Sequence, residues 1–434
     1  RKSWNFKFMT LSSIQSVVGR QILDSRGRPT VEVDVSLVDG SLGRASVPSG
    51  ASTGSFEAHE LRDGDATRFE GLGVLKAVSN INNDIAHAIS GMNAYDQRSL
   101  DNFLRELDGT PQLKKMGANA ILGVSIAVCR AAANSLKQPL YQRIADLLQN
   151  PTPQMPRPMV NIFSGGLHAG RGMDIQDFLA IPVRAQSIDE AIHTMSRVRN
   201  AAVRVCQKMG LPTLLADEGG LSPGCASGKD ALILLCKAIE MAGLTPGEDV
   251  VIAIDVAAAA FKNAEGHYNL AREGKQLSSA QMIDMLDAWV KEFPLVSIED
   301  GLDEEDWSGW QALTLRLGKH VQLVGDDLFT TNPIRLQKGI DMGVANGVLV
   351  KVNQNGTLTG TLDVITMAKK NGYSTIISAR SGETEDPFIA DLAVGSSAGQ
   401  IKIGSLRTSS TVSKYNQLLR IEAASNAPYV GTNQ

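Results

Sequence analysis

The chain has 434 residues, of which 43% are hydrophobic and 20% charged, enough apolar material for two or three domains or for one large barrel with an accessory domain. The 42 basic and 46 acidic residues give a formal net charge of −4, so no overall positive charge favours nucleic acid as a partner. No run of about 18 apolar residues occurs, and we therefore expect no membrane span.

The cysteines and histidines restrict the chemistry further. Cys129, Cys206, Cys225 and Cys236 show no CxxC spacing, so we expect free, mostly buried thiols in a reducing cytoplasm. No two histidines have the HxH or HExxH spacing of a zinc site. Any bound metal is therefore expected to be a hard cation held by carboxylates.

The first part of the chain predicts a small sheet followed by helices. Residues 30–37 (TVEVDVSL) alternate polar and apolar side chains, which is typical of a half-buried antiparallel strand, and turn-forming residues flank them on both sides. Residues 66–150 carry apolar side chains at helical spacing. We therefore expect an α+β domain over residues 10–150, and the proline-rich segment 150–158 (NPTPQMPRP) looks like a domain linker.

From residue 151 to residue 434, short apolar strands alternate with helices. This alternation predicts a parallel sheet covered by helices, and eight strands favour a closed (β/α)8-type barrel over an open sheet. The expected strands are residues 159–163, 178–183, 250–256, 296–300, 321–327, 347–353, 374–379 and 400–405.

Charged residues stand at the ends of six successive expected strands. In chain order they are Asp255, Glu299 with Asp300, Asp326 with Asp327, Lys351, Arg380 with Ser381, and Lys402. The carboxyl ends of barrel strands meet at one mouth, where active sites assemble, so we expect three carboxylates and three cations to converge there. A single charged residue at the end of a strand is often merely solvated, but charged residues at the ends of six successive strands disfavour that interpretation.

The acidic members of this group predict a metal site. Neighbouring carboxylates repel one another unless a cation neutralises them, and a ligand set made only of oxygen atoms suits Mg²⁺. Asp255, Glu299 and Asp326 form one such set. Alternation along a strand does not resolve adjacent acids, so Asp300 and Asp327 stay open as the inward-facing pair.

The basic members predict a base and an anion site. Lys351 stands within an apolar stretch, GVLVKVN, where a lysine is costly unless it faces the barrel mouth. Burial beside Lys402 and Arg380 is expected to lower its pKa and make it a candidate base, and a structural ion pair with a barrel carboxylate is the alternative. Arg380 and Ser381 offer donors for a phosphate or carboxylate, and Lys402 adds a charge for a second anionic group. A lysine base beside Mg²⁺ is a known way to form an ene-diolate next to a carboxylate.

With these residues and several long motifs, the sequence resembles the enolases, the phosphopyruvate hydratases. The motifs include DSRGRPTVEVDV (24–35), VPSGASTG (47–54), LADEGGLSP (215–223), SIEDGLDEEDW (297–307), GDDLFTTNP (325–333) and SARSGETED (378–386). The resemblance implies an enolase-type barrel with an α+β capping domain. It also implies Mg²⁺-dependent dehydration of 2-phosphoglycerate to phosphoenolpyruvate, a lyase reaction of glycolysis, by a cytoplasmic homodimer or larger homo-oligomer.

Position by position, the resemblance implies roles for individual residues. Lys351 takes the C2 proton of the substrate, and Glu218 donates a proton to the departing C3 hydroxyl. The implied substrate-binding residues are His168, Gln176, Asp177, Arg380, Ser381 and Lys402. The implied ligands of two Mg²⁺ ions are Asp255, Glu299, Asp326 and, in a loop that closes over the site, Ser52.

Several positions depart from the usual enolase motifs. Ala379 stands where SHRSGETED has a histidine, and Asp177 is one methylene shorter than the glutamate of QEF. The motif INGG is here FSGG, with Phe163 and Ser164, and IEDP is here IEDG, with Gly301. A paralogue that acts on a related phospho- or phosphono-carboxylate is therefore the alternative to an enolase, and a non-catalytic protein on the same scaffold is a third possibility. The retained base and carboxylates favour an enzyme.

Overall fold

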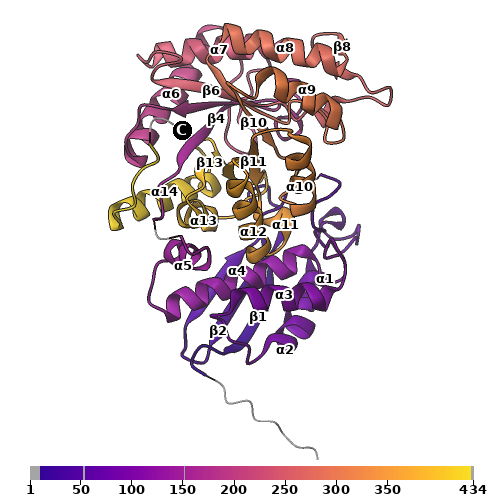
Figure 1. The fold of residues 1–434 in the computed structure, drawn as a ribbon, viewed down its shortest axis with the longest axis vertical. Helices are drawn as coiled ribbons and strands as arrows, with labels where there is room; N and C mark the ends of the chain where they lie inside the picture. The colour runs from indigo at the N-terminus through magenta and orange to yellow at the C-terminus, as the bar shows by residue number, and fades with distance from the viewer. Residues whose placement is uncertain (1–9, 52–53, 151, 432–434) are drawn as a thin grey trace, which may run out of the picture.

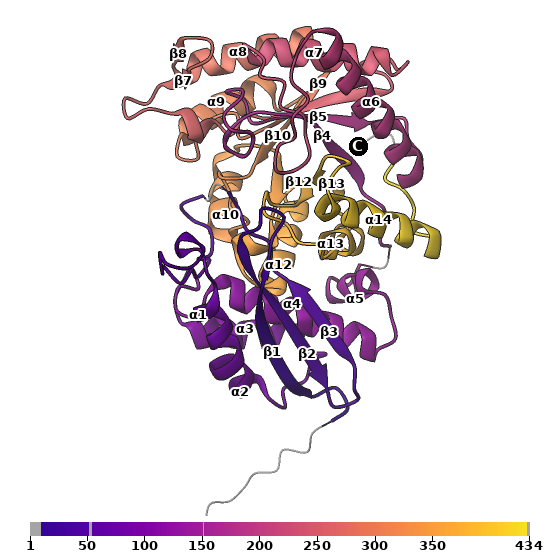
Figure 2. The ribbon, with the colours of Figure 1, turned by 180° about the vertical axis from the view of Figure 1, so that it is seen from behind.

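A computed structural model describes residues 10–51, 54–150 and 152–431. The described chain forms a three-stranded sheet with helices at one end and an eight-stranded barrel surrounded by helices at the other (Figures 1 and 2). The predicted fold class, a barrel with an N-terminal α+β domain packed against it, is confirmed.

The N-terminal sheet is antiparallel in the order β1 (Ile14–Leu23), β2 (Pro29–Leu37) and β3 (Leu42–Ser46). The alternation predicted for residues 30–37 is observed, because Val31, Val33 and Val35 are fully buried while the polar residues between them are half-buried. The helices are α1 (Leu75–Asn80), a π-helical turn (Ile81–Ile85), α2 (Ala86–Ile89), α3 (Gln97–Asp108), α4 (Ala118–Ser135) and α5 (Leu140–Leu147). Helix α4 packs on β2 and β3, and Gly43 permits this because a Cβ there would lie 2.0 Å from the Ala127 carbonyl oxygen.

All eight strands expected after residue 151 are present in the closed barrel. They are β4 (Arg157–Ser164), β5 (Asp177–Pro182), β6 (Val250–Asp255), β9 (Leu295–Glu299), β10 (Gln322–Gly325), β11 (Gly347–Val350), β12 (Ser374–Ser378) and β13 (Gly399–Gly404). The barrel closes in the order β10-β11-β12-β13-β4-β5-β6-β9. A short hairpin of β7 (Tyr268–Leu270) and β8 (Lys275–Leu277) lies outside it. The helices are α6 (Ile188–Lys208), α7 (Gly228–Met241), α8 (Ser279–Glu292), α9 (Trp307–Leu317), α10 (Pro333–Met342), α11 (Val352–Asn355), α12 (Leu358–Lys370), α13 (Phe388–Ser396) and α14 (Ser409–Ala424).

The prediction of an all-parallel barrel is wrong for β5, which runs antiparallel to both β4 and β6. The connection from Ser164 to Asp177 contains only a single 3-10 turn (Leu167–Ala169), whereas a parallel crossover usually needs a helix. Two helices, α6 and α7, then follow β5 before β6. As a result, the first residue of β5, Asp177, pairs with the last residue of β6, Asp255.

An apolar layer fills the middle of the barrel. Its side chains are Met159, Leu179, Ile181, Val251, Ala253, Val324, Leu349 and Ile376, and they form a cluster apart from the main core. Neighbouring strand residues such as Leu323, Val350 and Ile377 belong instead to the large core between strands and helices. Side chains two positions beyond the middle layer therefore point into a mouth of the barrel.

No single helix of the described residues is long and apolar enough to cross a membrane. Helices α4 and α5 reach that length and composition only together, across a bend of 107°. The residues of α4 are almost all buried within the protein.

Candidate active site

The six predicted charged positions converge on one mouth of the barrel. Asp255 and Glu299 are the last residues of β6 and β9, and Asp326 follows the end of β10 by one position. The strands that carry the six positions are neighbours in the barrel, in the order β6, β9, β10, β11, β12 and β13. The prediction that Lys351 lies inside a strand is wrong. Lys351 directly follows β11 and precedes α11.

The structure resolves the adjacent acids that alternation left open. Asp255 and Asp326 lie two positions beyond the inward-facing Ala253 and Val324, so both point into the mouth. Asp300 does not, because its two carboxylate oxygens accept the backbone N–H groups of Asp326 at 3.0 Å and Asp327 at 2.8 Å. Asp300 has a φ of +42°. Through these two hydrogen bonds, its carboxylate holds the turn that follows β10.

Lys402 lies between two of the three predicted metal ligands. Its Nζ donates to Asp255 Oδ2 at 2.8 Å and to Glu299 Oε2 at 2.7 Å, and all three side chains are buried. Burial and the nearby Asp255 carboxylate hold the pKa of Glu299 well above its usual value. The other carboxylate oxygen, Glu299 Oε1, is buried without a hydrogen-bond partner in the described part of the chain.

Lys351 forms an ion pair with the third predicted ligand, Asp326, whose other oxygen accepts the Gln354 amide at 2.8 Å. The prediction of a lowered lysine pKa is wrong for this arrangement. Burial acts to lower the pKa of Lys351, but the attraction of Asp326 and Glu299 outweighs it, and the pKa lies above its ordinary value. The ion-pair alternative considered for Lys351 is therefore what the structure contains.

These carboxylates fit a hard cation. The three come from neighbouring strands, are buried, and present only oxygen atoms, including the unpartnered Glu299 Oε1. A second group of acids, Asp300, Asp326 and Asp327, has ligand atoms within 4.8 Å of one another. We favour the first group, because Asp300 is turned away from the mouth toward two backbone N–H groups, whereas Glu299 keeps a buried oxygen without a partner in the described part of the chain.

His168 and Asp177 lie on the neighbouring side of the mouth, next to β4. Asp177 Oδ1 accepts Asn161 Nδ2 at 2.7 Å and Ser164 Oγ at 2.9 Å, and it lies 3.1 Å from His168 Nε2. Gly220 makes room for this group, because a Cβ there would lie 2.4 Å from Ser164 Oγ. Burial acts to lower the pKa of His168, but Asp177 outweighs it and raises that pKa to about 9, so the imidazole is charged at neutral pH.

Glu218 and Gln176 complete this side. Burial and the adjacent Asp177 raise the pKa of Glu218, which favours its protonated form. Gln176 donates its amide to Asp255 Oδ2 at 2.9 Å. Glu218, which keeps its proton, therefore stands beside Asp177, which is held ionised. Neighbouring carboxyl groups with pKa values shifted in opposite directions can serve as an acid and a base.

Arg380 and Ser381 follow β12. The Arg380 guanidinium donates to both oxygens of Glu57, at 3.0 and 3.2 Å, and to Asn353 Oδ1 at 2.9 Å. Sequence reasoning missed Glu57, which is 8% exposed. Only two features of the sequence could have indicated Glu57 as a partner of Arg380. It follows the glycine-rich loop directly, and it is an acid near a predicted anion site.

The glycine-rich loop reaches this side of the barrel from the N-terminal domain. The backbone N–H of Ala51 donates to Ser381 Oγ at 2.9 Å, and Ser49 exchanges backbone hydrogen bonds with Gly382. Ser52, the predicted ligand of a second Mg²⁺, lies outside the described residues.

The described site residues enclose a small cavity. Its lining includes Leu167, His168, Gln176, Asp177, Glu218, Asp255, Lys351, Ala379, Arg380, Ser381 and Lys402. The cavity thus brings together a lysine, a carboxylic acid, a charged histidine and two further cations. Such a set can bind a small polyanion and move protons on it.

Two family models match the chain. The model for the enolase N-terminal domain matches residues 14–144, and the model for the enolase C-terminal TIM barrel domain matches residues 152–434. The second match covers well over half of the chain, and the protein therefore belongs to the enolase family. The family supports an enolase-like, Mg²⁺-dependent hydro-lyase activity. The boundary between residues 150 and 151, the cytoplasmic location and the homo-oligomer remain predictions.

Proposed function

We propose that the protein dehydrates 2-phosphoglycerate to phosphoenolpyruvate. The observation that supports this most is the single cavity in which Lys351, Glu218 and the anion-binding cations meet. The substrate carries one carboxylate, one phosphate, an acidic C2–H and a C3 hydroxyl, and the cavity offers a chemical counterpart to each.

The anionic groups of the substrate find partners on two strands. Arg380 and Ser381, after β12, would bind the phosphate, since a guanidinium and a hydroxyl match phosphate oxygens. Lys402, on β13, would bind the carboxylate beside Asp255 and Glu299. The ion pair with Glu57 fixes the position of the Arg380 guanidinium before the substrate binds.

The metal would be held by Asp255, Glu299 and Asp326, with Gln176 orienting Asp255. When bound, Mg²⁺ supplies positive charge that stabilises the negative charge developing on the substrate carboxylate. A second Mg²⁺, with Ser52 among its ligands, is part of the same proposal.

Lys351 would remove the C2 proton, because Asp326 would no longer stabilise the charged form of the lysine once that carboxylate holds Mg²⁺. Glu218 would donate a proton to the departing C3 oxygen. Lys351 lies at the end of β11 among the carboxylates, while Glu218 lies across the mouth beside His168 and Asp177. The proton that Glu218 retains because of burial and Asp177 is the proton that this step requires.

This proposal is tested by mixing the protein with 2-phosphoglycerate and Mg²⁺ and following the ultraviolet absorbance of the enol phosphate. We expect turnover that chelation of Mg²⁺ abolishes and that falls by about 10³-fold or more in Lys351→Ala. Lys370→Ala, an exposed lysine on α12, is the matched control and should keep full activity. Turnover that survives in Lys351→Ala would contradict the assignment of the base.

A second candidate function is action on a related phospho- or phosphono-carboxylate. It is favoured by Ala379, whose methyl group lines the cavity, and by Asp177, which is held by Asn161, Ser164 and His168. The Ala379 methyl group cannot hydrogen-bond the C3 hydroxyl of 2-phosphoglycerate, and Asp177 Oδ1 already accepts Asn161 and Ser164.

Ala379→His separates the two functions. If 2-phosphoglycerate is the substrate, the added imidazole should raise its turnover, because it restores a donor beside the departing hydroxyl. The measurement is kcat/KM for 2-phosphoglycerate in both proteins. No gain, together with tight binding of a different phospho-acid by the unmodified protein, would favour the second function.

A further inference from the structure

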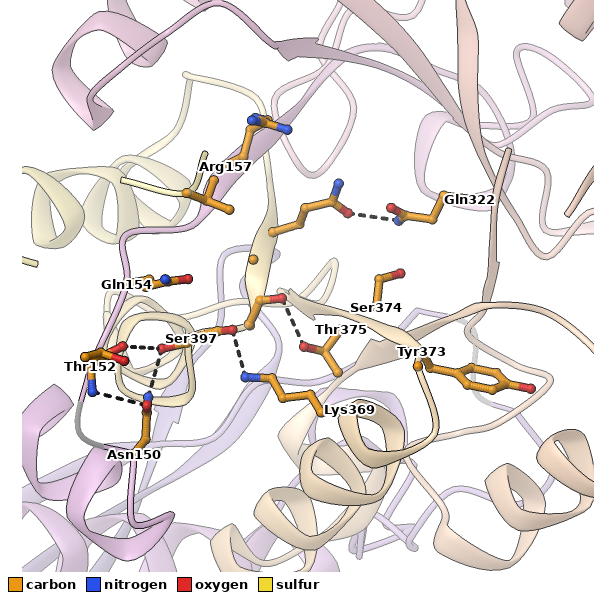
Figure 3. Close-up of a pocket in the computed structure, with 15 residues that line it drawn as sticks. Asn150, Thr152, Gln154, Arg157, Gln322, Lys369, Tyr373, Ser374, Thr375 and Ser397 are labelled. Atoms are coloured by element: carbon orange, nitrogen blue, oxygen red, sulfur yellow. Dashed lines mark hydrogen bonds between the residues drawn. The ribbon is translucent and has the colours of Figure 1, made fainter. Parts of the chain in front are cut away.

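A second polar cavity lies at the opposite mouth of the barrel, where the strands begin (Figure 3). Its volume is about 570 Å³. The strand residues that line it include Arg157, Gln322, Ser374 and Gln400. The first three precede the middle-layer residues Met159, Val324 and Ile376 by two positions, and Gln400 precedes Lys402 by two. The apolar layer therefore separates this lower cavity from the candidate active site.

The charge of the lower cavity is one-sided. Its lining contains Lys369 and Arg157 but no carboxylate side chain among the residues that the structure describes. Arg157 Nη2 donates to the Gly431 carbonyl at 2.6 Å. Lys369 Nζ donates only to main-chain carbonyls, those of Ser396 and, at 2.8 Å, Ser397. It has no acidic partner in the described part of the chain, and the residue is exposed, so its ammonium can reach an anion in the cavity.

Side-chain amides add neutral donors to this charge. Gln322 Nε2 donates to Gln400 Oε1 at 2.9 Å, and the bond crosses the mouth because β11 and β12 lie between the two strands (Figure 3). The amide nitrogen of Gln400 then has no hydrogen-bond partner among the described residues, and the same is true of the Gln154 side chain. Gln154 and Gln400 are both partly exposed, so their amides can donate hydrogen bonds to a ligand in the cavity.

We propose that the lower cavity binds a small oxyanion that carries phosphate or carboxylate groups. Lys369 supplies the charge that no acidic side chain balances, and the amides of Gln400 and Gln154 supply further hydrogen bonds to oxygen. Because the apolar middle layer closes the barrel between the two mouths, this site is separate from the one that would bind the substrate of the proposed reaction.

The test is isothermal titration calorimetry of the full chain at low ionic strength, with inorganic phosphate and malonate as separate probes. Titrations are repeated in an Arg380→Met background, where the upper cavity lacks its guanidinium. We expect one binding event to remain in that background, and Lys369→Met added to it should weaken the event by roughly tenfold or more, as the loss of a charged hydrogen bond predicts. Phosphate binding without malonate binding would assign a phosphate ligand, and the reverse a carboxylate.

Lys370→Met is the matched control, because Lys370 is the next residue of α12 and does not line the cavity. Gln400→Leu is a second variant that leaves Lys369 and its carbonyl partners in place, and it decides the question if Lys369→Met does not fold. Both Lys369→Met and Gln400→Leu should weaken binding while Lys370→Met does not. Unchanged binding in both, or no event in the Arg380→Met background, would overturn the proposal, and neither result depends on turnover of 2-phosphoglycerate.

Discussion

At the scale of single residues, the protonation states around the cavity depend on Asp177. It accepts hydrogen bonds from Asn161 and Ser164 and faces His168, so it stays ionised despite complete burial. Its charge keeps His168 protonated and helps Glu218 to keep a proton. Ser164, which stands where the motif INGG has an asparagine, thus donates one of the hydrogen bonds that hold this shorter side chain.

His168 is expected to titrate with a pKa of about 9, against an ordinary value of 6.5. Because the folded-state pKa is raised, the stability that this pair contributes is fully present below 6.5 and is lost as the pH rises through about 9. Nitrogen NMR of the imidazole measures the pKa directly. Asp177→Asn should lower it, because burial is then opposed only by the more weakly acting charges of Glu218 and Asp255. A pKa near 6.5 in the unmodified protein would contradict the pairing.

At the scale of elements, most strands were predictable because buried barrel strands are short apolar runs bounded by turns. The orientation of β5 was not predictable from its own residues, since its direction depends on the helix missing before it and the two helices after it. That orientation brings Gln176 and Asp177 to the active mouth at the start of a strand, whereas other strands contribute their ends. Adjacent acids were equally unresolved, because only the packed middle layer shows which of them faces inward.

The position of Asp326 in the candidate site depends on the turn after β10 that the Asp300 carboxylate holds. Asp300→Ala would leave the backbone N–H groups of Asp326 and Asp327 buried without acceptors, at a cost of about 1–3 kcal/mol each. We expect lower stability in urea and a weaker dependence of melting temperature on Mg²⁺, because Asp326 loses its position. Asp341→Ala, on the exposed part of α10, is the control and should change neither quantity. Full Mg²⁺ response in Asp300→Ala would show that the turn holds without this carboxylate.

At the scale of the whole molecule, the N-terminal domain and the barrel both contribute to the candidate active site, since Glu57 from one holds Arg380 from the other. A buried ion pair also joins them: Arg130 of α4 donates to Asp386 at 2.8 and 2.5 Å. Burial acts to raise the pKa of Asp386, but Arg130 outweighs it and holds that pKa below its ordinary value of 3.8. The stability from this pair is thus present above pH 3.8 and lost as the pH falls through the lowered pKa.

Asp386→Asn is therefore expected to destabilise the protein by about 3 kcal/mol at neutral pH, because it leaves the mostly buried Arg130 without its countercharge. Denaturant unfolding at pH 7 measures the change. Asp363→Asn is the matched control, since its pair with Arg98 also joins the two domains but both side chains are at least half exposed. It should cost no more than about 1 kcal/mol. Equal losses of unfolding free energy in Asp386→Asn and Asp363→Asn would show that burial of the Arg130–Asp386 pair adds nothing to its contribution to stability.

The most direct test of the proposed reaction is exchange of the C2 hydrogen of 2-phosphoglycerate in D₂O with Mg²⁺, followed by proton NMR. Glu218→Gln removes the acid but leaves Lys351 in place, so C2 should exchange with solvent while phosphoenolpyruvate forms slowly or not at all. In Lys351→Ala neither exchange nor product should appear. Exchange that persists in Lys351→Ala, or is absent from Glu218→Gln despite bound substrate, would contradict the assignment of Lys351 as the base.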